Sequence, residues 1–286
     1  AASLPPLDPF RTTMHRRTFL GGLAVPQAPQ SGPVIDAHNH LNHHSRPTWR
    51  EDDRKLIEAA DKLGIDQLCC SILPPERPIS LDGFRQSNVW LREAIARFPG
   101  RLLGYCVVNP GYARQALAEI RRYVEDHGFI GVKLYNDYRA DEPIVRPIVE
   151  LAIELKLPIL HHAGHASWLP SPQPRISDAS HIAALAADYP EATLICAHIC
   201  GGGDWEWSIK ALRGAPGVYL DTSGSVADEG VVEMAARLLG AQRLLFACDL
   251  SMTASVGRLR GARISESDRR AIFGGNMQRL LVRRAQ

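Results

Sequence analysis

Histidine and aspartate stand at the ends of several short apolar runs in this sequence. The chain has 11 histidines among 286 residues, and six of them follow such runs: His38, His40, His161, His162, His165 and His198. Asp249 directly follows another run of this kind. Neutral imidazoles with one carboxylate suit a divalent cation, with Zn²⁺ ahead of Mn²⁺, Fe²⁺ or Ni²⁺. The sequence therefore predicts a metal centre, with one or two ions and zinc as the first expectation.

His38 and His40 lie two residues apart at the end of the run that begins at Val34. Side chains alternate between the two faces of a strand, so residues at this spacing point the same way. The pair is therefore expected to act as a clamp on the metal. The same alternation allows only one of the adjacent His161 and His162 to point toward that site.

Eight apolar runs recur along the chain at intervals of 25 to 35 residues. They begin near Val34, Gln67, Leu102, Ile130, Pro158, Thr193, Val218 and Leu244. Most are separated by segments of helical periodicity, such as the one that runs from Leu56 to Leu63 and is closed by Gly64. Strands that alternate with helices imply parallel βαβ units, and eight such units close a barrel. We therefore expect an α/β fold, a single-domain (β/α)8 TIM barrel over residues 34–286.

An open, doubly wound sheet is the alternative architecture for such a repeat. The first run is not followed by the Gly-x-Gly-x-x-Gly pattern typical of nucleotide-binding sheets, which favours the barrel. Barrel enzymes carry their chemistry at the carboxyl ends of the strands. The histidines and Asp249 occupy those positions, so four strands are expected to meet at one site.

Composition and charge point to a small-molecule substrate. The formal net charge is +2, and the basic residues are dispersed along the chain, which argues against nucleic acid as a partner. No apolar run is long enough to cross a bilayer, so we expect no membrane-spanning segment. A homo-oligomer is compatible with the sequence, which does not decide the oligomeric state.

Residues 1–33 differ in composition from the rest and are expected to form a leader. The stretch from Arg16 to Val25, with its two arginines and short apolar segment, resembles a twin-arginine export signal that begins near Met14. This predicts export to the periplasm. The alternative is a disordered leader on a cytoplasmic protein.

The six cysteines fall in or beside the apolar runs and lack the spacing of a disulfide or zinc-finger framework. We expect them to be buried core thiols. Such usage fits folding in a reducing compartment, and twin-arginine export carries proteins that are already folded.

The strand-end residues resemble those of the amidohydrolase superfamily. That superfamily has His-x-His on strand one, His on strands five and six, and Asp on strand eight. Several longer segments resemble its amidohydrolase-related (amidohydrolase 2 type) branch in particular: residues 35–40 (IDAHNH), 131–134 (GVKL), 158–164 (PILHHAG), 197–202 (AHICGG), 245–249 (LFACD) and 275–281 (GNMQRLL). The resemblance extends over the whole expected barrel.

The resemblance implies a role for each strand-end residue. It makes His38, His40 and His162 metal ligands, while Asp249 binds the metal or its water. His162 is preferred over His161 because the ligand of the motif directly precedes a small residue and glycine. His198 would then polarise the nucleophilic water or the substrate, or bind a second ion.

Lys133, at the end of the fourth run, decides between one metal ion and two. In binuclear members of the superfamily a lysine at this strand end is carbamylated and bridges two metals. The alternative is a free ammonium group that binds a substrate carboxylate. A lysine aimed into a barrel is costly without a partner, so either reading places it in the site.

The expected activity is metal-dependent hydrolysis of a small carboxylate-bearing ester, lactone or amide. A metal-bound water is the nucleophile, Asp249 the general base and His198 the group that stabilises the oxyanion. Substrate contacts are expected from loop residues, chiefly Arg139, His165, Trp168, Arg175 and Trp205, with Asp204, Trp207, Ser223 and Ser225 as further candidates. A nonoxidative decarboxylase with the same ligands is the alternative enzyme, and an inactive ligand-binding barrel is the non-enzymatic one.

Overall fold

The computed structural model describes residues 32–42, 47–164, 175–199, 205–224, 226 and 228–285. These residues belong to one compact unit. The expected export signal and the expected substrate contacts His165, Trp168, Asp204 and Ser225 lie outside the described residues. No helix within the described ranges is long and apolar enough to cross a membrane.

Eight parallel strands pair in chain order, each with the next. They are β1 (Ile35–His40), β2 (Gln67–Ser71), β3 (Leu102–Val107), β4 (Gly131–Leu134), β5 (Pro158–His161), β6 (Thr193–Cys196), β7 (Val218–Asp221) and β8 (Leu244–Leu245). Each strand begins within one residue of the start expected from the sequence. The (β/α)8 barrel prediction is therefore confirmed.

Hydrogen bonds between β1 and the segment after β8 bring the first and last strands together. The Ala37 N–H donates to the Phe246 carbonyl at 2.8 Å, and the Asp249 N–H donates to the His38 carbonyl at 2.8 Å. The Cys248 N–H also donates to the carboxylate of Asp36, at 3.0 Å. The closure thus ends at the residues expected to hold the metal.

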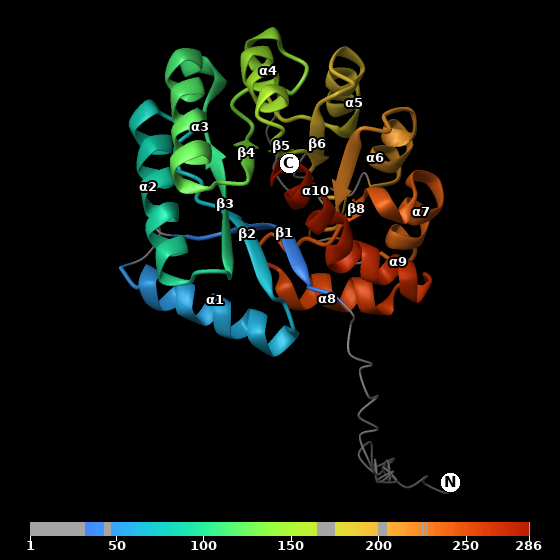
Figure 1. The fold of residues 1–286 in the computed structure, drawn as a ribbon. Coiled ribbons are helices and arrows are strands. Elements are labelled where there is room, and N and C mark those ends of the chain that lie inside the picture. The colour runs from blue at the N-terminus through green and yellow to red at the C-terminus, as the bar shows by residue number, and fades with distance from the viewer. Residues whose placement is uncertain are drawn as a thin grey trace, which may run out of the picture. The chain divides into compact units, whose positions relative to one another are not determined.

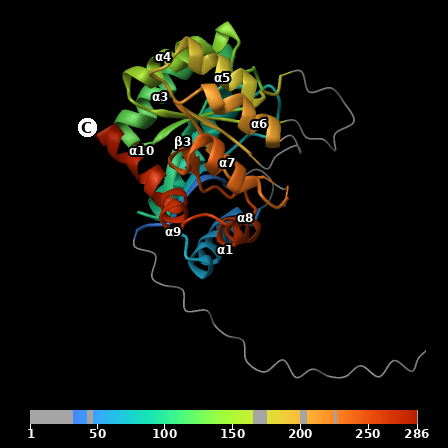
Figure 2. The same cartoon turned by 90° about the vertical axis from the view of Figure 1, so that its right-hand side faces the viewer.

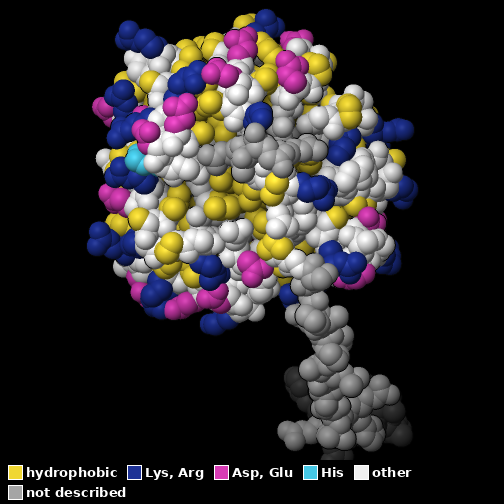
Figure 3. All heavy atoms as spheres, viewed as in Figure 1, with side chains coloured by type: hydrophobic (Ala, Val, Ile, Leu, Met, Phe, Trp, Pro, Cys, Tyr) yellow, Lys and Arg dark blue, Asp and Glu magenta, His cyan; other side chains and the backbone are white. Residues whose placement is uncertain are grey.

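Helices surround the strands in chain order (Figure 1). They are α1 (Trp49–Leu63), α2 (Leu81–Arg97), α3 (Ala113–His127), α4 (Arg146–Glu154), α5 (Ala179–Asp188), α6 (Trp205–Ala211), α7 (Val231–Leu239), α8 (Met252–Gly261), α9 (Glu266–Arg270) and α10 (Asn276–Ala285). Short turns complete the chain: η1 (Pro110–Tyr112), η2 (Pro143–Val145), η3 (Leu212–Gly214), η4 (Ala241–Arg243) and the π-helical η5 (Ala271–Gly275). Charged side chains of both signs are spread over the face in Figure 3, in line with the dispersed charge of the sequence.

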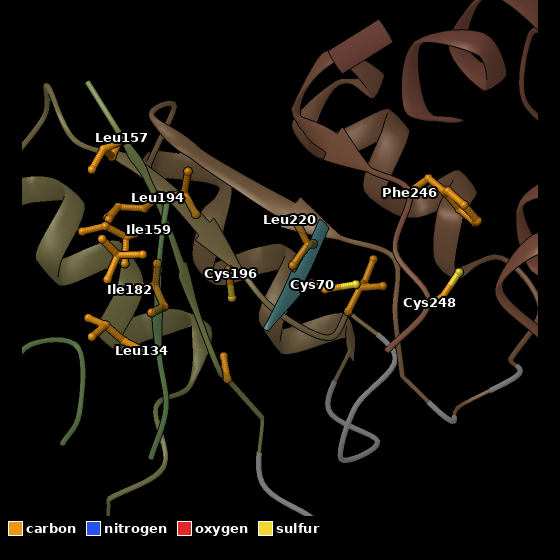
Figure 4. Close-up of a cluster of buried hydrophobic side chains, with 14 of the residues drawn as sticks. Cys70, Leu134, Leu157, Ile159, Ile182, Leu194, Cys196, Leu220, Phe246 and Cys248 are labelled. Carbon is orange, nitrogen blue, oxygen red and sulfur yellow. The ribbon is translucent and has the colours of Figure 1, made fainter. Parts of the chain in front are cut away.

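The apolar core has two layers, one on each side of the strands. The outer layer joins strands to helices, and Figure 4 shows Leu134, Ile159 and Leu194 of three neighbouring strands beside Ile182 of α5. The inner layer fills the barrel with Ile35, Ala37, Cys69, Tyr105, Ile130, Leu160, Ile195, Ala197, Leu245, Met277 and Leu280. The five described cysteines are free and buried, as expected for core thiols.

The C-terminal helix α10 covers one end of the barrel (Figures 1 and 2). Its Met277 and Leu280 pack in the inner layer with Ile35, the first residue of β1, and with Ile130, just before β4. The side chain of Asn276 donates to the carbonyls of η4 and β8. Because α10 covers the amino ends of the strands, the carboxyl ends are the end available for chemistry.

A β-bulge in β1 sets the direction of the two clamp histidines. Asp36 pairs with Leu68, but Asn39 pairs with Cys70, so β1 has one more residue than β2 over the same stretch. The side chains of Ile35 and Ala37 point into the barrel, so unbroken alternation would point Asn39 inward and His38 outward. The extra residue of the bulge shifts the alternation, and His38 points into the barrel as well.

We expect Gly274→Ala to destabilise the protein, because a Cβ at this position would lie 1.8 Å from the Pro33 carbonyl oxygen. Overpacking of this kind typically costs about 1–3 kcal/mol of unfolding free energy. The matched control is Gly275→Ala, whose Cβ would meet its nearest atom at 3.7 Å. Urea denaturation of both variants measures the effect, and equal stabilities would contradict it.

Candidate metal centre

Three side chains from β1 and the segment after β8 bring donor atoms together at the carboxyl end of the barrel. His38 Nε2 lies 3.1 Å from His40 Nε2, and Asp249 Oδ1 lies 3.2 Å from His40 Nε2 and 3.9 Å from His38 Nε2. Metal–ligand bonds of about 2.0–2.2 Å place neighbouring ligand atoms about 3–3.6 Å apart. The spacing of these three atoms therefore fits a divalent cation.

The backbone near the site is held in an uncommon conformation. His198, Asp249 and Leu250 have φ angles of 65°, 43° and 71°. Positive φ is uncommon in residues other than glycine, and such strain persists where surrounding structure enforces it, often at functional sites. At Asp249 the enforcing contact is the hydrogen bond from its N–H to the His38 carbonyl.

His198, two residues beyond β6, links the other members of the cluster. Its Nδ1 lies 3.5 Å from Asp249 Oδ2, and its Nε2 lies 3.0 Å from His162 Nδ1. The ligand atoms of His38, His198 and Asp249 all lie within 4.8 Å of one another. The structure thus brings together all five residues expected at the centre, with His162 reached through His198.

Asp221, the last residue of β7, was missed by the sequence analysis. Its fully buried carboxylate accepts from His38 Nδ1 at 2.8 Å, from the His198 N–H at 2.9 Å and from the Ser223 hydroxyl at 2.6 Å. Burial raises the pKa of Asp221, but His38, His198 and the Ser223 hydroxyl together have the larger, opposite effect and hold that pKa well below the usual range. Its place at a strand end, like that of Asp249, was the signal that could have found it.

The partners of the two clamp histidines determine which ring nitrogens carry lone pairs. The Asp221 carboxylate only accepts, so His38 Nδ1 donates to it and the neutral ring keeps a lone pair on Nε2. His40 Nδ1 lies 2.9 Å from the Ser71 hydroxyl and 3.3 Å from the Ser71 carbonyl. Because the carbonyl only accepts, it favours a proton on Nδ1 and a lone pair on Nε2. Two lone pairs and a carboxylate oxygen then face one another, an arrangement that a cation stabilises.

Burial keeps the imidazoles neutral, as metal binding requires. Burial and the charge of Lys133 lower the pKa of His38 to about 3, against the opposing effect of Asp221. Burial also lowers the pKa of His198, and burial together with His198 places the pKa of His162 well below its usual value. These rings are therefore uncharged at neutral pH.

Lys133, the third residue of β4, points into the cluster. It is fully buried, and its Nζ lies 2.9 Å from His38 Nε2. Burial lowers the pKa of Lys133 to about 8, and the carboxylates of Asp249 and Asp221 limit that decrease. The prediction that this lysine aims into the barrel mouth matches its position.

The adjacent His161 and His162 have different surroundings. The His162 ring packs 4.3 Å from the Tyr135 ring and 4.8 Å from the His198 ring. His161 is buried with its Nδ1 on the His162 carbonyl, and its Nε2 has no hydrogen-bond partner among the described residues. Only His162 therefore contacts the cluster, which favours it as the ligand of the pair.

Most of the expected substrate residues that the structure describes lie away from the cluster. Arg139 forms an ion pair with Asp141 at 3.3 Å, and Arg175 donates weakly to the Asp137 carbonyl. Trp205 donates to the carboxylate of Asp228. Trp207 is 72% exposed, whereas Ser223 contacts His198 directly. Of these candidates, only Ser223 joins the cluster.

A (β/α)8 barrel with imidazoles and a carboxylate converging at its strand ends is typical of metal-dependent enzymes that work at the barrel mouth. The chain belongs to the amidohydrolase family, whose sequence model matches residues 35–283. It is therefore an enzyme of the amidohydrolase superfamily, as the strand-end residues predicted.

The relatives of this chain include several decarboxylases. It is 24% identical over 285 residues to the gamma-resorcylate decarboxylase of Polaromonas sp. strain JS666, covering 80% of this chain and 86% of the relative. A dihydroxybenzoic acid decarboxylase from the same strain, with bound manganese and 2-nitroresorcinol, has a similar structure with TM-score 0.68 and 21% identity, covering 88% of this chain and 97% of the other. The 5-carboxyvanillate decarboxylase of Sphingomonas paucimobilis gives TM-score 0.67 and 17% identity over 87% and 99%.

These comparisons support a divalent metal, because manganese is bound in a similar structure and the donor atoms here have a fitting arrangement. They do not single out zinc, which stays a prediction.

We predict that His162→Asn weakens metal binding by at least about tenfold, the range seen when metal sites lose supporting residues. His161→Asn is the matched control, because it changes the neighbouring buried histidine and leaves the cluster intact. Elemental analysis after dialysis against buffered metal, with circular dichroism as a check of folding, measures both. Greater loss of metal in the His161 variant would reverse the assignment.

Asp221→Asn is expected to lower metal affinity about 10- to 100-fold, because the amide can donate to His38 Nδ1 and shift the ring proton to Nε2. The control Asp188→Asn removes an exposed carboxylate that pairs with Arg146 on the surface. Titration with metal ion by calorimetry gives both affinities. Equal affinities in the two variants would show that Asp221 does not set the state of His38.

Proposed function

We propose that this protein is a metal-dependent nonoxidative decarboxylase of an aromatic carboxylic acid. The observation that carries the proposal is the match to a gamma-resorcylate decarboxylase over 80% of the chain. Hydrolysis, the first expectation from sequence, has less support, because decarboxylases recur among both the sequence and the structural relatives. The alternative drawn from the sequence thus becomes the main proposal.

The residues that would hold the metal are His38, His40, His162 and Asp249. Imidazole and carboxylate ligands suit both Mn²⁺ and Zn²⁺. A divalent cation held there would supply positive charge that favours binding of a substrate carboxylate and withdraws electron density from the substrate. The tautomers set by Asp221 and Ser71 keep the Nε2 atoms of the two clamp histidines ready to bind it.

Decarboxylation needs one proton and no oxidant. The ring carbon that bears the carboxylate gains the proton, the electrons of its bond to the carboxyl carbon return to the ring, and carbon dioxide leaves. We assign this proton transfer to Asp249, because its side chain is 29% exposed and its Oδ2 lies 3.5 Å from His198 Nδ1. His198 exchanges the proton with Asp249, while Oδ1, beside His40, remains on the metal side.

Lys133 acts in this proposal as a free amine in a site with one metal ion. Its Nζ lies beside His38 Nε2, within reach of a carboxylate bound at the centre. A carbamate bridge between two metals is the alternative carried over from the superfamily. One metal equivalent per chain supports the free amine, and two support the bridge.

Protein loaded with Mn²⁺ or Zn²⁺ is expected to release carbon dioxide from 2,6-dihydroxybenzoate or a related hydroxybenzoate. Mass spectrometry of the headspace and chromatography of the phenol product measure the reaction. Esters and lactones of the same acids serve as the comparison. Hydrolysis of those compounds without carbon dioxide release from any hydroxybenzoate would overturn the proposal in favour of a hydrolase.

Asp249→Asn should lower kcat by about 10²- to 10⁴-fold, the usual contribution of a positioned proton-transfer group. Asp82→Asn, in the exposed first turn of α2, is the control for the loss of one acidic group. Metal content is measured alongside for each variant. Unchanged turnover in an Asp249→Asn variant that retains its metal would remove this residue from the mechanism.

A further inference from the structure

Ser223, two residues beyond the end of β7, lies between the carboxylate of Asp221 and the ring of His198. Its side chain is fully buried. Its hydroxyl oxygen lies 2.6 Å from Asp221 Oδ1 and 2.9 Å from His198 Nδ1. A buried hydroxyl with these two partners acts on the centre through the His198 ring.

The number of protons fixes the direction of both hydrogen bonds. A carboxylate only accepts, so the Ser223 hydroxyl donates its single proton to Asp221. The serine oxygen then offers only lone pairs to His198, so Nδ1 of that ring is the donor. A neutral imidazole carries one N–H group, which leaves the lone pair of His198 on Nε2.

The loop that carries Ser223 is held on both sides of this residue. Arg258 of α8 donates to three backbone carbonyls of the loop. The acceptors are Thr222 at 2.7 Å, Gly224 at 2.8 Å and Val226 at 2.9 Å. The N–H of Ser223 donates to the same carboxylate as its hydroxyl, at 3.0 Å. These bonds fix the hydroxyl beside the imidazole.

The two nitrogens of His198 face different neighbours. Asp249 Oδ2 also faces Nδ1, but at 3.5 Å it lies beyond the range of about 2.7–3.2 Å for ordinary N–H···O hydrogen bonds, so Ser223 is the closer acceptor. Nε2 lies 3.0 Å from His162 Nδ1, close to the 3.1 Å that separates the Nε2 atoms of the two clamp histidines. The free lone pair of His198 is therefore directed at an expected metal ligand.

We infer that Ser223 is a positioning residue, which holds the proton of His198 on Nδ1 and thereby keeps the Nε2 lone pair directed into the metal centre. One carboxylate then sets two rings. Asp221 Oδ2 holds the proton of His38 directly, and Oδ1 holds that of His198 through Ser223. Without the hydroxyl, the proton is free to move to Nε2, where it competes with a cation. The inference concerns the ring before substrate binds, so it does not depend on the reaction proposed above.

The position of the proton is measured by NMR of the metal-free, full-length protein with isotopically labelled histidine. The two neutral forms of an imidazole give different long-range correlations between the ring nitrogens and the protons on the ring carbons. The signals of His198 are identified by their loss in His198→Gln. Wild-type protein is expected to carry the His198 proton on Nδ1. A proton on Nε2 in the wild type would overturn the inference.

Ser223→Ala is expected to shift His198 partly to the form with its proton on Nε2. It should also weaken the binding of Zn²⁺ or Mn²⁺ by about tenfold, the lower end of the effect of groups that orient metal ligands. Calorimetric titration with the metal ion alone gives the affinity.

Ser255→Ala is the matched control, because Ser255 is a buried serine whose hydroxyl has no hydrogen-bond partner among the described residues. It should keep the wild-type proton position and an affinity within about twofold of the wild type. An unchanged proton position and affinity in Ser223→Ala, or equal losses in the two variants, would contradict the inference. The expected results without carbon dioxide release from any hydroxybenzoate would support the inference and count against the proposed function alone.

Discussion

The centre depends on two hydrogen bonds that fix the protons of His38 and His40 on the outward ring nitrogen. Asp221 accepts from one ring and the Ser71 carbonyl from the other, so both Nε2 lone pairs point into the barrel 3.1 Å apart. Lone pairs this close repel each other and the nearby Asp249 oxygen. The fold holds them together because β1, β2, β7 and the end of β8 are fixed by backbone hydrogen bonds. The resulting negative potential is what makes the strand ends a cation site.

The same barrel that builds this potential also excludes water from it. His38, Lys133 and Asp221 are fully buried, and α10 covers the opposite end of the barrel. Burial lowers the pKa values of His38, His162 and His198, so protons do not compete strongly with a metal for these rings. Lys133 is the remaining cation in the interior, and its Nζ contacts the same nitrogen of His38. A metal and the Lys133 ammonium therefore compete for one lone pair, which links the metal content of the site to the state of this lysine.

The barrel and its central residues could be predicted because both follow from patterns among residues that are close together in the sequence. Apolar runs and helical segments alternate along the chain, and the reactive residues directly follow the runs. Asp221 and Ser71 also stand at strand ends, but their function depends on contacts across the barrel with His38 and His40. The bulge in β1 was not predicted, because it exists only in the pairing of β1 with β2. The two-residue spacing places His38 and His40 on one side of β1, and the bulge explains why that side is the interior.

Substrate residues were predicted less well than the centre, for a physical reason. A strand fixes the direction of its side chains by alternation, but a loop residue can satisfy its charge with whichever partner lies nearby. Arg139 pairs with Asp141, only two residues away, and the indole N–H of Trp205, at the start of α6, donates to Asp228. Arg77 differs because its guanidinium lies over the ring of Tyr135, which packs on His162, so its position is tied to the centre. In this barrel the strand ends fix the positions of the candidate centre, and a loop side chain such as Arg77 is tied to it only through a strand-end group such as Tyr135.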